Sequence, residues 1–192
     1  LKAFEAVESG KAEFDTVMNA LTEDPERLVS SHALAKEIHQ IAQDIPDEED
    51  ALIALVIAAD ISTHGFGMGE VHLRINAAQI RNAMRPVDGR TISVSDGVSS
   101  PRLLIERLAL RIRKESAWDI SFASLDGETA TARRQLMLAT QFLKHIDSDQ
   151  PVRLLIAECE KPLTIMSALY LAHKFGITGM IDISPLFETS YG

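Results

Sequence analysis

The stretch from Pro151 to Gly192 constrains the fold of this chain more than any other part of the sequence. Val152 to Ala157 is a short apolar run without helical periodicity, which is typical of a strand buried on both faces. Pro162 suits the first turn of a helix, and Gly176 stands where that helix would end in a left-handed residue. A second apolar run, Met180 to Ile183, follows. A strand, a crossover helix and a second strand in about thirty residues form a βαβ unit with parallel pairing. The fold is therefore predicted to be α/β.

A further strand is predicted after a glycine-containing stretch near residue 65. The pattern GFGMG precedes this strand and lacks the full phosphate-cradling glycine set, so a dinucleotide loop is a weak interpretation. Alternation places Val71, Leu73 and Ile75 on one face and Glu70, His72 and Arg74 on the other. Residues 69–75, 152–157 and 179–184 are predicted to be parallel strands of one sheet with helices outside.

Residues 1–63 are predicted to form a helical segment. Asp24-Pro25 is a suitable start for a helix that carries an apolar stripe of Leu34, Ile38, Ile41 and Ile45. The next helix, Ala51 to Asp60, is apolar all round and is expected to be packed on several sides. His32 and His39 are interpreted as surface residues of a helix.

The middle of the chain is predicted to contain two helices. The first runs from Ser100-Pro101 to about Glu115 and is basic. It is either an anion or subunit contact, or a solvated helix that offsets nearby carboxylates. The second runs from Glu128 to Ile146, with Leu138, Phe142 and Ile146 inward. His145, near its C-terminus, is expected to be favoured in the protonated form by the helix dipole.

Charge and cysteine content exclude several classes of protein. The 192 residues carry a net charge of −9 with a pI near 5.1, which argues against a broad nucleic-acid surface and against attraction to anionic membranes. The single cysteine, Cys159, excludes an internal disulfide and fits a reducing cytoplasm. No apolar run reaches the length of a transmembrane helix. The absence of an initial Met and the end at Gly192 suggest a piece of a longer protein.

Two segments resemble the phosphoenolpyruvate carboxylase family. They are PLFET at Pro185–Thr189 and HGFGMGEVHLRINAAQIRNAM at His64–Met84. The resemblance implies that residues 64–192 are part of a (β/α)8-type barrel that continues beyond this sequence. It further implies a cytoplasmic carbon–carbon lyase that forms a homo-oligomer, a tetramer, and has neither a nucleic-acid nor a membrane partner.

The same resemblance assigns roles to two residues. Arg74 corresponds to the arginine that holds the phosphate of the substrate, a suitable partner because a guanidinium fork matches phosphate bidentately. From the residues alone, the alternative is an interior arginine paired with Glu70 or another carboxylate. Glu188 corresponds to the glutamate that binds the essential Mg²⁺ or Mn²⁺, an ion that needs few protein carboxylates.

The chain also departs from the family. Gln79-Ile80 stand where the family has an Arg-His pair, whereas Thr164 corresponds to the hydroxyl or acid that is expected in the helix after Cys159. Glu158 and Glu160 replace residues that are usually neutral or carry a hydroxyl. An acidic pair can bind a divalent metal, although a pair that opens a helix is commoner.

The implied reaction joins bicarbonate to phosphoenolpyruvate and yields oxaloacetate and phosphate. The family's His-Pro-Thr motif and its Gly/Arg-rich loops are absent from this sequence, so the segment alone is expected to be inactive. Two alternatives stay open. One is a non-catalytic α/β module of the same fold used for regulation or assembly. The other, a helical interaction protein, would explain residues 1–60 only.

Overall fold

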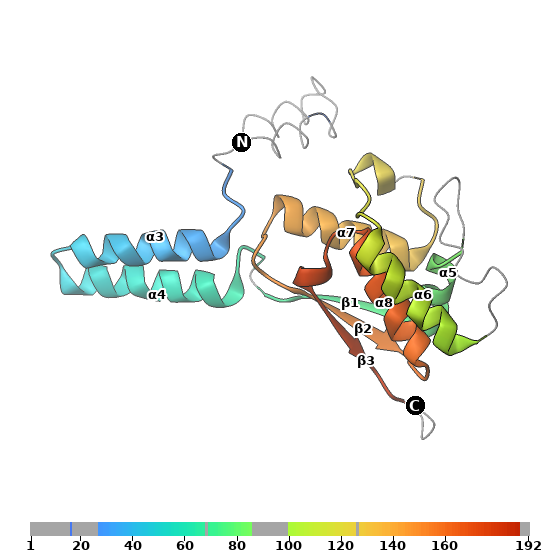
Figure 1. Cartoon of the computed structure of the whole chain (residues 1–192). Helices are drawn as coiled ribbons and strands as arrows, with labels where there is room; N and C mark the ends of the chain where they lie inside the picture. Colours follow the sequence, from blue (N-terminus) through green and yellow to red (C-terminus); the bar gives the residue numbers. More distant parts are fainter. Residues whose placement is uncertain (1–15, 17–26, 68, 86–99, 126, 189–192) are drawn as a thin grey trace. The chain divides into compact units, whose positions relative to one another are not determined.

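The computed structural model describes residues 16, 27–67, 69–85, 100–125 and 127–188 (Figure 1). The chain divides into two compact units. Unit 1 takes in residues 1–71 and 141–151, and unit 2 takes in residues 72–140 and 152–192. The division into 1–63 and 64–192 stays a prediction about domains, whereas in the structure residues 141–151 pack with the N-terminal unit.

Unit 1 is built on a hairpin of two helices, α3 (Ser31–Asp44) and α4 (Glu48–His64). Asp47 caps α4, because its Oδ1 accepts hydrogen bonds from the backbone N–H groups of Glu49 and Asp50, at 3.0 Å each. The first turn of α4 is acidic, which complements the positive N-terminal end of the helix dipole.

Small residues form the seam between α3 and α4. Ala35, Ala42 and Ala58 are buried there, whereas large aliphatic side chains of α4 such as Leu52 and Val56 are about 60% exposed. Within the described residues, α3 is the helix that packs against α4. The expectation that this apolar helix is packed on several sides is therefore wrong for the described part of the chain.

Helix α3 begins later than predicted. Asp24-Pro25 lie outside the described residues, and Ser30 is the N-cap, accepting a hydrogen bond from the N–H of Ala33 at 3.0 Å. Ser30 Oγ also donates to Asp149 Oδ2 at 2.5 Å. The start of the helix is therefore fixed by a carboxylate far away in the sequence, which a local pattern does not show.

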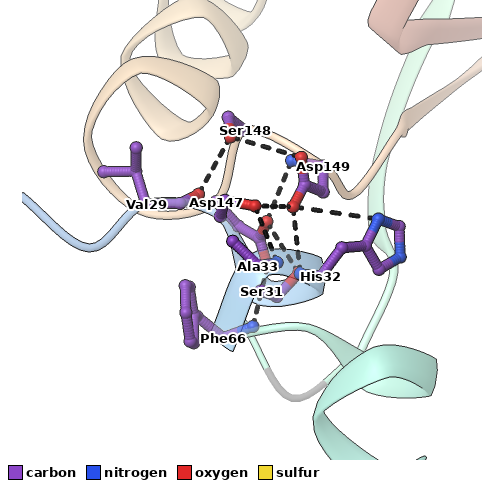
Figure 2. A network of polar contacts seen from close by, with 9 residues as sticks. Val29, Ser31, His32, Ala33, Phe66, Asp147, Ser148 and Asp149 are labelled. Carbon is purple, nitrogen blue, oxygen red and sulfur yellow. Dashed lines mark hydrogen bonds and ion pairs between the residues drawn. The ribbon is translucent and has the colours of Figure 1, made fainter. Parts of the chain in front are cut away.

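Two aspartates between α7 and β2 hold the N-terminus of α3 and the chain after α4 together (Figure 2). Asp147 is fully buried and accepts hydrogen bonds from Ser31 Oγ at 3.1 Å and from the N–H of Phe66 at 2.8 Å. Burial alone would raise the pKa of Asp149, but hydrogen bonds from Ser30 and from the His32 backbone outweigh it and lower that pKa. His32 is exposed, as predicted, and lies 3.8 Å from Asp149.

Unit 2 contains the predicted sheet. Strands β1 (Val71–Asn76), β2 (Val152–Ala157) and β3 (Ile181–Pro185) lie in the order β1-β2-β3 (Figure 1). Strands β2 and β3 are parallel, with Val152 opposite Ile181 and Ile156 opposite Pro185. The predicted three-stranded parallel sheet is confirmed, although β3 begins at residue 181, after a 3₁₀ turn at Thr178–Met180, rather than at 179.

Helix α8 (Pro162–Lys174) connects β2 to β3 and covers the sheet. It begins at Pro162 and ends just before Gly176, whose φ of 74° is the left-handed conformation predicted there. It packs against β3, α5 (Ala77–Ala83) and α6 (Pro101–Lys114). The predicted bounds of α6 are confirmed.

The two faces of the sheet differ. The side chains of Val152, Leu154 and Ile156 are fully buried, whereas His72, Arg74 and Asp182 are exposed. The fold is thus α/β and helix-rich, with a small parallel sheet. No described helix is both long enough and apolar enough to cross a membrane.

Helix α7 (Thr131–His145) begins after Glu128, the predicted start, and turns a different face toward the core. Glu128 precedes the helix and lies 3.6 Å from the buried guanidinium of Arg133. Leu138, predicted to point inward, is 48% exposed, and Leu136 and Met137 are buried instead. The inward face is thus displaced from the one that the apolar stripe suggested.

The expected protonation of His145 is also wrong. Its pKa is lowered to about 4, first by burial and then by the nearby charges of Arg27 and Lys144. The Arg27 guanidinium lies 3.2 Å from His145 Nδ1. These effects outweigh the helix dipole, so the imidazole is neutral at physiological pH.

Candidate functional site

The candidate site lies at the C-terminal edge of the parallel sheet. β1 ends at Asn76, β2 at Ala157 and β3 at Pro185, so the loops that follow these strands gather at one edge. In open and closed parallel sheets, this edge is where ligands bind.

Backbone hydrogen bonds fix the loop after β3 to the end of β2. The N–H of Leu186 donates to the carbonyl of Ile156 at 2.9 Å, and the N–H of Cys159 donates to the carbonyl of Leu186 at 3.3 Å. Leu186 thereby positions Glu188, two residues further on, at this edge. The role of Leu186 was missed from the sequence, although its place inside PLFET was a signal.

The structure brings the two predicted site residues together. Arg74 Nη2 lies 4.0 Å from Glu188 Oε1, and the two side chains are 70% and 44% exposed. Arg74 is therefore paired with a carboxylate, but it is not the interior arginine of the alternative interpretation. An ion pair this exposed adds about 0–1 kcal/mol to stability, so folding alone gives little reason for it.

Gln79 and Ile80, which depart from the family pattern, have structural roles. Asn76 and Gln79 form a capping box at the start of α5, with each side chain accepting the other's backbone N–H at 2.9 Å. Ile80 is fully buried. The spacing of Asn76 and Gln79 was a readable signal for this cap.

The residues after β2 are divided between surface and core. Glu158 is exposed and has a φ of 54°, a left-handed conformation that is uncommon outside glycine. Cys159 and Thr164 are buried, and burial raises the pKa of the Cys159 thiol. Neither the thiol nor the Thr164 hydroxyl is therefore presented at the surface, whereas Glu158 and Glu160 are.

Glu188 is a carboxylate of the kind that Mg²⁺ or Mn²⁺ needs. Glu188 is accessible and lies at the C-terminal edge of the sheet, which suits an ion that keeps several water ligands. Among the residues that the structure describes, no group of three His, Cys, Asp or Glu side chains is arranged to hold a metal. Glu188 is therefore suited to serve as one ligand of such an ion.

Comparison of the chain with models of known protein families, with curated proteins and with solved structures found no match.

Proposed function

We propose that this chain is part of an enzyme that carboxylates phosphoenolpyruvate with bicarbonate and releases oxaloacetate and phosphate. The proposal rests on the resemblance of residues 64–84 and 185–189 to the phosphoenolpyruvate carboxylase family. The single structural observation that supports it most is the approach of Arg74 to Glu188 at the C-terminal edge of the sheet. A cation for the phosphate and a carboxylate for a metal ion would both be needed there.

We further propose that the sheet is a section of a (β/α)8-type barrel. In such a barrel helices cover the outer face of the strands, and the inner face meets other strands. The contrast between the buried side chains of β2 and the exposed His72, Arg74 and Asp182 is what one section of that barrel would present. The inward residues near the strand ends would then face the active site.

Arg74 is assigned to the phosphate of the substrate. Its guanidinium is permanently charged, exposed, and suited to bidentate hydrogen bonding with phosphate oxygens. Bicarbonate oxygen attacks phosphorus, the bond from phosphorus to the enolate oxygen breaks, and carboxyphosphate and the enolate of pyruvate result. Carboxyphosphate then yields CO2 and phosphate, and the enolate carbon captures the CO2. Arg74 would stabilise the negative charge on the phosphoryl oxygens during transfer.

Glu188 is assigned to the divalent ion. When bound, Mg²⁺ or Mn²⁺ supplies charge stabilisation for developing oxyanions. Before ligands bind, Arg74 and Glu188 neutralise one another across 4.0 Å. Phosphate would draw the guanidinium away from the carboxylate and leave its oxygens free.

A second candidate function is a non-catalytic α/β module used for regulation or assembly. It is favoured by Gln79 and Ile80, because one is engaged in a cap and the other in the core where the family has charged residues. Exposed Glu158 and Glu160 would also add negative charge to an edge that is meant to bind anions.

The test uses the full-length protein that contains this chain. Arg74→Ala should lower kcat/KM for phosphoenolpyruvate about ten- to a hundredfold, because a charged hydrogen-bond partner of the phosphate is lost. Arg134→Ala, an exposed arginine on α7, is the matched control and should have little effect. Absence of turnover in the intact protein would favour the non-catalytic module.

Metal binding tests the other assignment independently. Glu188→Gln keeps the shape of the side chain and removes its charge, so the affinity for Mn²⁺ should fall when measured by calorimetry at fixed pH. Equal binding by the two proteins would show that Glu188 is not a ligand.

A further inference from the structure

A groove with a volume of about 610 Å³ runs along the hairpin of α3 and α4. It lies within unit 1, because the residues that line it all belong to these two helices. We call it the α3–α4 groove. Its volume is within the range of roughly 300–1,000 Å³ that is usual for small-molecule sites, which are mostly apolar and carry a few polar groups.

The α4 side of the groove is apolar. Leu55, Ala58 and Ala59 line it, and their spacing of i, i+3 and i+4 places them on the same side of the helix. Ala58 and Ala35 of α3 are buried, whereas Leu55 is 37% exposed. Because the buried side chains between the helices are single methyl groups, an apolar group has room above them.

The α3 side of the groove carries a lysine between two histidines. His32, Lys36 and His39 follow one another at i, i+4 and i+7, so all three lie on one side of the helix. Lys36 is the only lysine or arginine among residues 28–73, in a chain whose net charge is −9. A lysine can lay its aliphatic stem on apolar surface while its ammonium group stays in water. The one permanent cation of the hairpin therefore borders its apolar groove.

Two of these polar groups are available to a ligand. Within the described part of the chain, no residue forms a hydrogen bond or ion pair with the Lys36 ammonium or the His39 imidazole. His32 differs, because its Nδ1 lies 3.8 Å from Asp149 Oδ2 (Figure 2). No aspartate or glutamate is among the described residues that line the groove. An anion is therefore attracted to Lys36 and His39, one turn or more away from the Asp149 carboxylate.

We propose that the α3–α4 groove binds a small organic acid with an apolar body, such as a medium-chain carboxylate. The acid accepts hydrogen bonds from Lys36 Nζ and from an N–H of the His39 ring, and its aliphatic body covers Leu55 and Ala59. An ammonium group has three donors and a neutral imidazole has one, so no change of protonation is needed. This site goes beyond the proposed carboxylation and does not depend on it.

Other classes of ligand use only part of the groove. An inorganic anion would pair with Lys36 and leave the side chains of Leu55 and Ala59 in water, and an exposed ion pair alone is weak and screened by salt. An uncharged apolar molecule would leave the ammonium group without a partner. A metal ion is excluded because His32 and His39 lie about 10 Å apart along the helix axis, whereas metal–nitrogen bonds are about 2 Å long.

Calorimetric titration of the full chain with octanoate tests the proposal. Octanol has the same aliphatic chain without the charge, and inorganic phosphate has charge without the chain. We expect one octanoate to bind per chain with a Kd of about 1 mM or tighter. Octanol and phosphate should each bind at least fivefold more weakly. Absence of octanoate binding, or equal binding of octanol or phosphate, would overturn the proposal.

Substitutions on both sides of the groove locate the site. Lys36→Gln should weaken octanoate binding up to about fivefold, and Lys114→Gln, at an exposed lysine of α6, is its matched control. Ala59→Glu places a carboxylate in the groove and should weaken binding at least tenfold. Ile57→Glu, on the opposite side of α4, should leave binding unchanged. Circular dichroism checks that the helices persist. Equal effects of Lys36→Gln and Lys114→Gln would overturn the proposal even if Ala59→Glu does not fold.

Histidine ring signals in NMR spectra of the unsubstituted chain give a second location. Addition of octanoate should shift the ring signals of His32 and His39, which line the groove. His72 and His173 belong to unit 2 and should keep their signals. Shifts confined to these two histidines would place the acid elsewhere and would likewise overturn the proposal.

Discussion

Glu115 and Glu188 lie at opposite ends of the strands in unit 2 and are held in very different ways. Glu115 lies beside the end of α8 that leads toward the start of β3, and its carboxylate meets Arg111 at 2.5 Å, Tyr170 at 2.8 Å and Lys174 at 3.4 Å. Glu188 follows the end of β3 and approaches Arg74 only to 4.0 Å. The first carboxylate is therefore held in place by several partners, and the second is left accessible to a ligand.

The surroundings of Glu115 add to this difference. Lys174 Nζ donates to the Ser116 carbonyl and lies 5.1 Å from the centre of the Trp118 ring, and Trp118 packs edge-on against Phe175. In parallel α/β barrels the N-terminal edge of the strands contributes stability, and the C-terminal edge carries ligands. The two glutamates lie toward these opposite ends of the strands, and the ligand role of Glu188 stays a prediction.

The largest expected effect on stability is that of Glu115→Ala. It leaves the nearly buried ammonium of Lys174 without its carboxylate and should lower the free energy of unfolding by about 2–3 kcal/mol in urea titrations. Glu106→Ala, at an exposed glutamate of α6, is the control and should cost less than about 0.5 kcal/mol. Similar losses for the two variants would remove the distinction between a held and an exposed glutamate.

A smaller loss is expected for Tyr170→Phe. The ring keeps its buried position and its contact with the Arg111 guanidinium, 5.0 Å away, but the hydrogen bond to Glu115 is lost. The expected cost is about 1 kcal/mol. The double variant with Glu115→Ala should lose less unfolding free energy than the sum of the two single losses, because both substitutions remove the same hydrogen bond. Full additivity would contradict the proposed network.

The pH dependence of stability tests whether Glu115 is held by its charged and hydrogen-bonding partners. Burial alone would raise the pKa of Glu115, but hydrogen bonds from Arg111 and Tyr170 and the charge of Arg111 hold it below its ordinary value of 4.5. Since the folded-state pKa is the lower one, this stabilisation is complete above pH 4.5 and is lost as the pH falls through the folded-state pKa. The difference in unfolding free energy between wild type and Glu115→Gln should therefore shrink below about pH 4.5. A difference that stays constant down to pH 3 would contradict this assignment.

Local patterns predicted the elements that depend on local chemistry. The three strands and α8 were predicted because apolar runs, Pro162 and Gly176 determine the structure of the residues next to them. The βαβ pattern correctly predicted the parallel pairing of β2 and β3. It did not predict the approach of Arg74 to Glu188, and the phosphate and metal roles of these residues stay predictions.

Predictions failed where distant residues decide the outcome. Asp149 fixes the start of α3 through Ser30, and burial together with Arg27 lowers the pKa of His145. The Glu115 cluster joins the ends of α6 and α8, so the sequence showed only its i, i+4 pair with Arg111. Packing of α4 depends on what lies beside it, which periodicity does not reveal.

The smallest effect on stability is expected at the ligand edge. Arg74→Gln and Glu188→Gln should each change the free energy of unfolding by less than about 0.5 kcal/mol, because their ion pair is long and exposed. The measurement is urea unfolding of both variants beside Glu115→Ala, in low and in moderate salt. Because exposed pairs are screened, even the small difference should fall in moderate salt. A loss above about 1.5 kcal/mol in either variant would show that the pair is part of the framework of unit 2. Arg74 would then have a structural reason to be where it is, and its assignment to a substrate phosphate would lose its main support.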